Sequence, residues 1–149
     1  MDLTPFQSVN GLSFGLAEKA IIEILGDPES EGLNAIGDLE LRYKDLLPRF
    51  STDEGMLEVS FNASTLSIGG HLVTFSGLQE FIRANDPESV EALGFIVSPK
   101  LGLAFDPDNP FWVSAFSKKR LNLWLELTQP NHRMHSDGAA SGPAGDARR

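Results

Sequence analysis

Residues 14–30 read FGLAEKAIIEILGDPES, and residues 75–89 read FSGLQEFIRANDPES, a weaker copy of the same stretch. In both copies the apolar residues recur at helical spacing, which places them on one face of an α-helix. In the first copy, Gly26 and Pro28 supply a left-handed stop and a residue that cannot continue a helix. Both copies end in Asp-Pro-Glu-Ser, beginning at Asp27 and at Asp86. The sequence therefore predicts one structural unit used twice, each with an amphipathic helix near its start.

After each helix the apolar period changes to two, which is typical of half-buried strands. We predict strands at residues 11–14, 39–44, 57–62, 65–68, 95–97, 101–105, 112–116 and 121–127. Residues 48–55 are predicted to be a turn, and residues 86–94 a second short helical piece capped by Asp86. The expected fold class is α+β, with two β-α-β-β-β-like repeats and the helices packed on one face of an antiparallel sheet.

The domain limits follow from where these patterns end. We expect a single domain over residues 1–128, with repeats at about 8–68 and 69–128. The remaining residues, 129–149, are expected to be a disordered tail, because residues 131–149 have no apolar period and are built mainly from Gly, Ala, Ser, Pro, Asp and Arg.

Charge and composition exclude several functions. The 149 residues contain no cysteine and carry a net charge of −9, and residues 1–130 hold 9 basic against 19 acidic residues. This acidity would repel phosphate backbones, so we expect no nucleic-acid partner. No apolar run approaches the roughly 20 residues that a membrane-spanning helix needs, and residues 1–10 have neither the basic start nor the apolar core expected of a secretion signal. We expect a cytoplasmic protein that does not bind membranes.

Few residues suggest catalysis or metal binding. His71 follows Gly69-Gly70 and is interpreted as a loop histidine rather than a ligand. The segment Asp106-Pro107-Asp108-Asn109-Pro110 has calcium-like ligand types, but it lacks the glycine and glutamate of a calcium loop and favours a turn. Glu58 and Glu126, each flanked by strand hydrophobics, are the acids that stand out most. We expect no metal, no cofactor and no catalytic residue, and an enzyme is the less favoured interpretation.

Aromatic residues near the end of the domain offer a candidate binding surface. Trp112 and Phe116 share a strand face, and Trp124 and Glu126 share a face of the predicted strand at 121–127. If that sheet face is open, Trp112, Phe116, Trp124 and Glu126 form a patch that can anchor a partner. The alternative is that these rings complete the hydrophobic core.

The first helix carries a resemblance to a known class. Phe14-Gly15-Leu16, then Ile21, then Leu25-Gly26-Asp27-Pro28 resembles the opening of bacterial two-repeat α+β domains. That class includes the β-lactamase inhibitor proteins and the small outer-membrane assembly lipoproteins, and both act by binding other proteins. The second copy departs from the pattern, with Ala84-Asn85 in place of Leu-Gly, and no lipid-bearing cysteine is present. The resemblance implies a protein-binding role over residues 8–127.

The tail carries a second resemblance. Gln129-Pro130-Asn131 must be encoded CAR-CCN-AAY, which fits the RYYYAAC core at the start of integron cassette recombination sites. The residues that follow, 132–140, look similar to translated recombination site in cassette proteins whose reading frame overruns. The resemblance implies that the protein is the product of an integron gene cassette in a bacterium, with its fold ending near Thr128.

Two functions fit these patterns. The favoured one is a non-enzymatic protein-binding domain encoded on a mobile cassette, of an inhibitory or immunity-like kind, with a basic protein as partner. The alternative is a small-ligand-binding or weakly catalytic α+β domain with a pocket between helices and sheet.

The tail prediction can be checked by truncation. A chain ending at Gln129 should melt within about two degrees of the full-length chain, because an unperiodic polar segment buries little area. Calorimetry of both chains measures this. A clear loss of thermal stability in the shortened chain would show that the tail packs on the domain.

Overall fold

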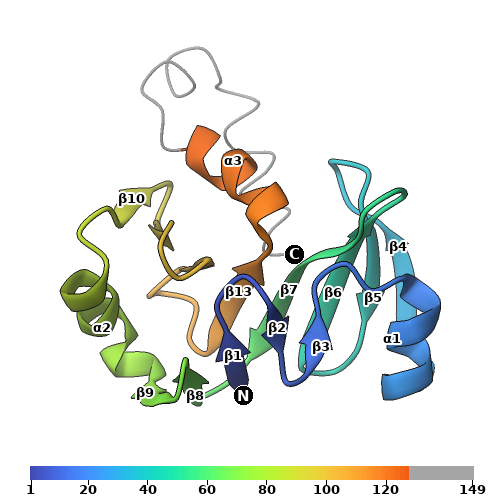
Figure 1. The fold of residues 1–149 in the computed structure, drawn as a ribbon, viewed down its shortest axis with the longest axis horizontal. Coiled ribbons are helices and arrows are strands. Elements are labelled where there is room, and N and C mark those ends of the chain that lie inside the picture. Colours follow the sequence, from blue (N-terminus) through green and yellow to red (C-terminus); the bar gives the residue numbers. More distant parts are fainter. Residues whose placement is uncertain (128–149) are drawn as a thin grey trace.

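The computed structural model describes residues 1–127, and the tail predicted at residues 129–149 lies outside them. Over this range the chain folds into two β-sheets and three α-helices, and the strand pairs are antiparallel except for one. Figure 1 shows α1 and α2 towards opposite ends of the molecule and α3 leaving the end of β13 between them. The predicted α+β class, with mainly antiparallel sheets, is confirmed.

The larger sheet has eight strands in the order β10-β11-β12-β13-β7-β6-β5-β4. Their bounds are β4 Ser30–Leu33, β5 Leu39–Arg42, β6 Leu46–Ser51, β7 Gly55–Asn62, β10 Val90–Ala92, β11 Phe95–Ser98, β12 Leu103–Phe105 and β13 Trp112–Phe116. All neighbouring strands are antiparallel, and β7 pairs with β13 at the centre.

The smaller sheet has five strands in the order β3-β2-β1-β8-β9. Their bounds are β1 Asp2–Thr4, β2 Ser8–Val9, β3 Leu12–Ser13, β8 Thr65–Ile68 and β9 His71–Thr74. Strands β1 and β8 form the parallel pair, which joins the N-terminus to the middle of the chain. Leu3, Val9 and Leu66 from this sheet pack in one hydrophobic cluster with Val59 and Phe61 of β7.

Helix α1 (Glu18–Leu25) and helix α2 (Leu78–Asn85) contribute to the same cluster. Ile21 of α1 and Ile82 of α2 are fully buried, as their apolar stripes predict. A 3₁₀ turn, η1 (Phe75–Gly77), precedes α2. The two helices predicted from the repeated stretch are therefore present, and both pack on the side of the large sheet that faces the smaller sheet.

The strand predicted at residues 121–127 is wrong: Lys118–Glu126 is a helix, α3. Leu121, Leu123 and Leu125 recur at every second position and so imitate a strand. The buried residues of α3 are instead Arg120 and Trp124, which lie four positions apart on one helix face. Trp124 belongs to a second cluster with Phe95 and Phe116, so α3 packs on the opposite face of the large sheet from α1 and α2.

Two smaller predictions are also wrong. The turn predicted at residues 48–55 contains most of β6, in which Pro48 pairs with Val59 and Arg49 with Glu58. The helical piece predicted at residues 86–94 is a turn followed by β10. In both places antiparallel pairing with the next strand of the chain, β6 with β7 and β10 with β11, outweighs the local turn and capping signals. No helix among residues 1–127 is long and apolar enough to cross a membrane.

Asp86 is the C-cap of α2, and its side chain stabilises the turn between β11 and β12 through hydrogen bonds. Its carboxylate accepts hydrogen bonds from Ser98 Oγ at 2.6 Å, from the Lys100 amide at 3.0 Å and from the Glu88 amide at 2.9 Å. Burial alone would raise the pKa of Asp86, but these hydrogen bonds outweigh it and hold the pKa below its ordinary value.

The lowered pKa of Asp86 predicts acid-dependent stability. A depressed pKa means that this carboxylate stabilises the fold above the ordinary value of 3.8 and loses that effect as the pH falls through the folded-state pKa. Asp86→Asn should therefore cost unfolding free energy at pH 7, and the gap to the unchanged chain should shrink below about pH 3.8. Urea unfolding across this range measures the gap. Asp108→Asn, in an exposed turn, is the control, and a gap for Asp86→Asn that does not vary with pH would contradict the assignment.

Candidate functional site

Helix α3 is attached to the large sheet by hydrogen bonds from two buried side chains. Arg120 donates to both carboxylate oxygens of Asp38, at 2.9 and 3.0 Å, a bidentate geometry. Trp124 Nε1 donates to Glu58 Oε1 at 3.0 Å. All four side chains are at least nine-tenths buried. The attachment of α3 therefore depends on polar contacts made away from solvent.

The sheet face beneath α3 continues this network. Arg49 Nη1 donates to Glu58 Oε2 at 2.8 Å and to Ser60 Oγ at 2.7 Å. Arg49 Nε donates to Glu40 Oε2 at 2.8 Å, and Ser60 Oγ lies 2.7 Å from Ser114 Oγ. Glu40, Arg49 and Glu58 are cross-strand neighbours on β5, β6 and β7, so the sheet register brings them together.

The network balances its charges. Asp38, Glu40 and Glu58 face Arg49 and Arg120, and Arg42 pairs with Glu40 at the exposed edge. Burial alone would lower the pKa of Arg120, but Asp38 and Glu58 outweigh burial and raise that pKa, so the guanidinium stays charged. Arg49 Nη2 is buried without a hydrogen-bond partner among residues 1–127. A buried network of this kind is costly to break, because the group left behind is an unpaired charge.

The structure separates the residues of the predicted aromatic patch. Phe116 is fully buried, and its ring stacks with Trp124 at 5.8 Å between centroids. Trp124 is 4% exposed, so both rings belong to the core beneath α3. Trp112 is half-buried, and Glu126 is exposed on α3. The patch does not form as predicted, because α3 covers the sheet face that the sequence pattern left open.

Trp112 lines a groove beside α3. The groove has a volume of about 320 Å³, and its lining includes Trp112, Phe95, Leu47, Lys44 and Asp106. The Ser60–Ser114 hydroxyl pair of the polar network also lines it. Apolar side chains with charged neighbours and a half-buried tryptophan are the composition of a surface that holds another molecule.

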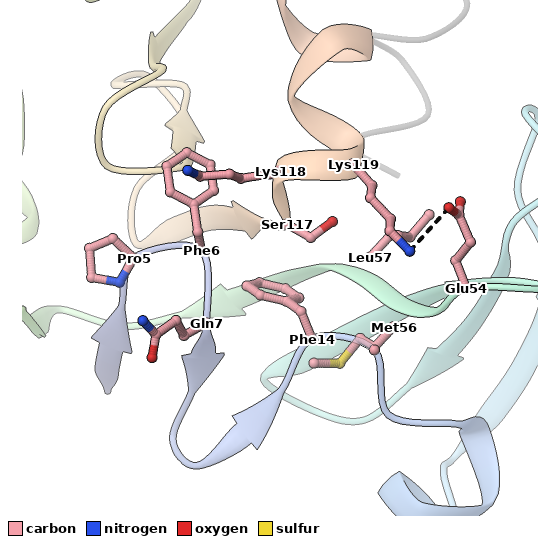
Figure 2. A pocket seen from close by; sticks show the side chains of 11 residues that line it. Pro5, Phe6, Gln7, Phe14, Glu54, Met56, Leu57, Ser117, Lys118 and Lys119 are labelled. Atoms are coloured by element: carbon pink, nitrogen blue, oxygen red, sulfur yellow. Dashed lines mark ion pairs between the residues drawn. The ribbon is translucent and has the colours of Figure 1, made fainter.

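A second pocket lies between α3, β7 and the N-terminal strands (Figure 2). Its volume is about 540 Å³. Phe6 and Phe14 form part of its apolar wall, and Lys118 Nζ lies 5.3 Å from the centroid of the Phe6 ring. Gly102 makes room for that ring, because a Cβ at this position would come within 2.9 Å of it. Sequence patterns gave no signal for this pocket, since its lining comes from three distant segments.

Among the other candidates from the sequence, His71 lies apart from these sites, whereas Asp106 lines the groove of Trp112. His71 is exposed on β9, with its ring 6.0 Å from that of Phe81. Asp106 accepts a hydrogen bond from the Asp108 amide, the geometry of a turn. Within the described range, residues 1–127, no three His, Asp or Glu side chains group as metal ligands. Glu58, singled out in the sequence, lies at the centre of the buried network.

Comparison with known proteins gives no match to a family model, to a curated protein or to a solved structure.

The buried network predicts a large cost for removing Glu58. Glu58→Ala leaves Trp124 Nε1 without its acceptor and removes one buried carboxylate partner each from Arg49 and Arg120, so the unfolding free energy should fall by about 3–5 kcal/mol. Glu54→Ala is the matched control, because Glu54 also pairs with a cation of α3, Lys119, but at the surface. It should cost about 0–1 kcal/mol. Denaturant unfolding measures both, and similar small losses would mean that the network contributes little.

Proposed function

We propose that this chain is a non-enzymatic protein-binding domain and that its partner contacts the groove beside α3. The main support for the proposal is the position of Trp112, whose half-buried ring lines a groove together with Phe95 and Leu47. Tryptophan is enriched among the residues that dominate interface energies, since one ring buries a large area at low entropic cost. The network around Glu58 supports the proposal by fixing one wall of the groove before a partner arrives.

The charge of the domain indicates the chemistry of the partner. Residues 1–130 carry 19 acidic and 9 basic residues. Among the basic residues, Arg42, Arg49 and Arg120 are engaged in ion pairs within the domain. A partner with a basic rim around an apolar centre would therefore be attracted at long range and held by the groove. An inhibitory or immunity-like role is the specific form we propose.

Two further parts of the proposal concern origin. The element order supports a two-repeat origin: each of α1 and α2 follows a hairpin and precedes four antiparallel strands, and the two sets of strands meet at β7 and β13.

We also propose that the protein is an integron cassette product located in the cytoplasm. The DNA on either side of the reading frame tests the cassette origin directly, through the presence or absence of recombination sites.

Small-ligand binding is the second candidate function. The observation that favours it is the pocket of about 540 Å³ between α3, β7 and the N-terminal strands, a size usual for small-molecule sites.

Trp112→Ala tests the leading proposal. It should weaken partner binding at least about tenfold, because it removes the central ring of the groove. Immobilised domain is exposed to host lysate at low and high salt, and retained proteins are identified and then purified for stopped-flow measurement. Association should slow as salt rises, since opposite charges guide the encounter.

The matched control is Phe111→Ala. Phe111 is an exposed aromatic next to Trp112 in the chain, but it is not among the residues that line the groove. The proposal fails if no protein distinguishes the two variants, or if every retained protein binds equally well to both.

A further inference from the structure

The pocket in Figure 2 is lined by a residue whose buried hydroxyl has no hydrogen-bond partner among residues 1–127. Ser117 precedes α3 as its N-cap, yet its side chain makes no capping hydrogen bond. Its Oγ is buried without a partner among residues 1–127, and the residue lines the pocket. The Ser117 amide donates to Leu57 O at 2.9 Å, which fixes the residue against β7. A buried hydroxyl without a partner in the chain is unfavourable, and an acceptor bound in the pocket would remove that cost.

Backbone donors accompany this hydroxyl. The first amides of a helix have no acceptor inside the helix, and they carry a partial positive charge. Within residues 1–127 the amides of Lys118 and Lys119 donate to no oxygen, whereas the Arg120 amide donates to Ser117 O at 3.0 Å. The first turn of α3 also contains no acidic residue. This end of the nine-residue helix therefore suits an anion.

The charges at the pocket match a single negative charge better than two. Lys118 and Lys119 both line it, and Figure 2 shows their side chains on either side of Ser117. Glu54 also lines the pocket, and its Oε2 lies 3.4 Å from Lys119 Nζ. The local charge is then near one positive unit plus the partial charge of the helix. A carboxylate fits this balance, whereas a phosphate dianion would be repelled more strongly by Glu54.

The rest of the lining is suited to an apolar group. Phe6, Phe14, Met56 and Leu57 line the pocket together with these charged residues. Its volume of about 540 Å³ lies within the range of small-molecule sites and far exceeds the space that an inorganic ion needs.

We propose that this pocket binds a small organic carboxylate, with the carboxylate at the N-terminus of α3 and an apolar body against Phe6 and Phe14. In the complex the Ser117 hydroxyl and the amides of Lys118 and Lys119 donate to the carboxylate, and Lys118 supplies the compensating charge. The site is separate from the groove of Trp112. The carboxylate proposal can therefore be right or wrong whether or not the groove binds a protein.

The probe is 4-phenylbutyrate, added to ¹⁵N-labelled full-length protein and followed by the backbone amide resonances. The amides of Lys118 and Lys119 should shift and saturate together. Phenylbutyramide has the same apolar body without the charge, and it should bind at least about tenfold more weakly, because charge-assisted hydrogen bonds are lost. Inorganic phosphate has charge without the apolar body and should also bind at least about tenfold more weakly.

Ser117→Ala distinguishes an effect on ligand binding from an effect on the stability of the fold. The Ser117 hydroxyl makes no hydrogen bond among residues 1–127, so the variant should melt at the same or a higher temperature, while its affinity for phenylbutyrate falls about tenfold. Lys118→Gln should also weaken binding. Lys100→Gln, an exposed lysine whose Nζ donates to Asn85 O, removes the same charge elsewhere and should leave binding unchanged.

Three outcomes would overturn the proposal. The first is the absence of saturable shifts at the N-terminus of α3. The second is equal binding of the amide or of phosphate, which would show that the charge or the apolar wall plays no part. The third is a Ser117→Ala variant that folds normally and binds phenylbutyrate as tightly as the unchanged chain.

Discussion

The ion pair between Arg120 and Asp38 joins residues 82 positions apart and holds α3 against the large sheet. Glu58 contributes to the same attachment, because it accepts from Trp124 and from Arg49 while lying 3.5 Å from Arg120 Nη1. Every one of these groups would be strongly destabilising if buried alone. The position of α3 is therefore constrained by the need to pair all of them at once.

The pocket of Ser117 depends on that placement, and the groove of Trp112 shares the sheet face that α3 covers in part. The groove of Trp112 lies on the sheet face next to α3, and the pocket of Ser117 lies where α3 begins. The hydrophobic core contributes differently: its main cluster, around Val59 and Phe61, is on the other face of the sheet and joins α1, α2 and the smaller sheet. One face of the sheet thus carries the larger hydrophobic cluster. The other face carries the buried hydrogen-bonded network around Glu58 and the groove of Trp112. This separation allows the face beneath α3 to carry costly polar groups without weakening the main core.

Specific residues explain which predictions succeeded. Helices α1 and α2 were predictable because Ile21 and Ile82 sit on apolar stripes with helical spacing. Strands such as β13 were predictable because Val113 and Ala115 face one cluster while Phe116 faces the other. Glu58 stood out in the sequence as an acid among strand hydrophobics, but its role could not be predicted. Its partners Arg49 and Arg120 come from β6 and α3, whereas the sequence placed Arg49 in a turn and Arg120 just before a predicted strand.

The sequence by itself determined the α+β class, the two helices of the repeated stretch, most strands of the large sheet and the acidic character of the surface. These features depend on periodicity and composition, which act locally along the chain. Only the tertiary structure decided that residues 118–126 form a helix, that Trp124 and Phe116 are core residues, and that Ser117 faces a pocket. The physical reason is that α3 is specified by Arg120 and Trp124 meeting Asp38 and Glu58. Pairing between buried charges far apart in the chain leaves no periodic pattern in the sequence.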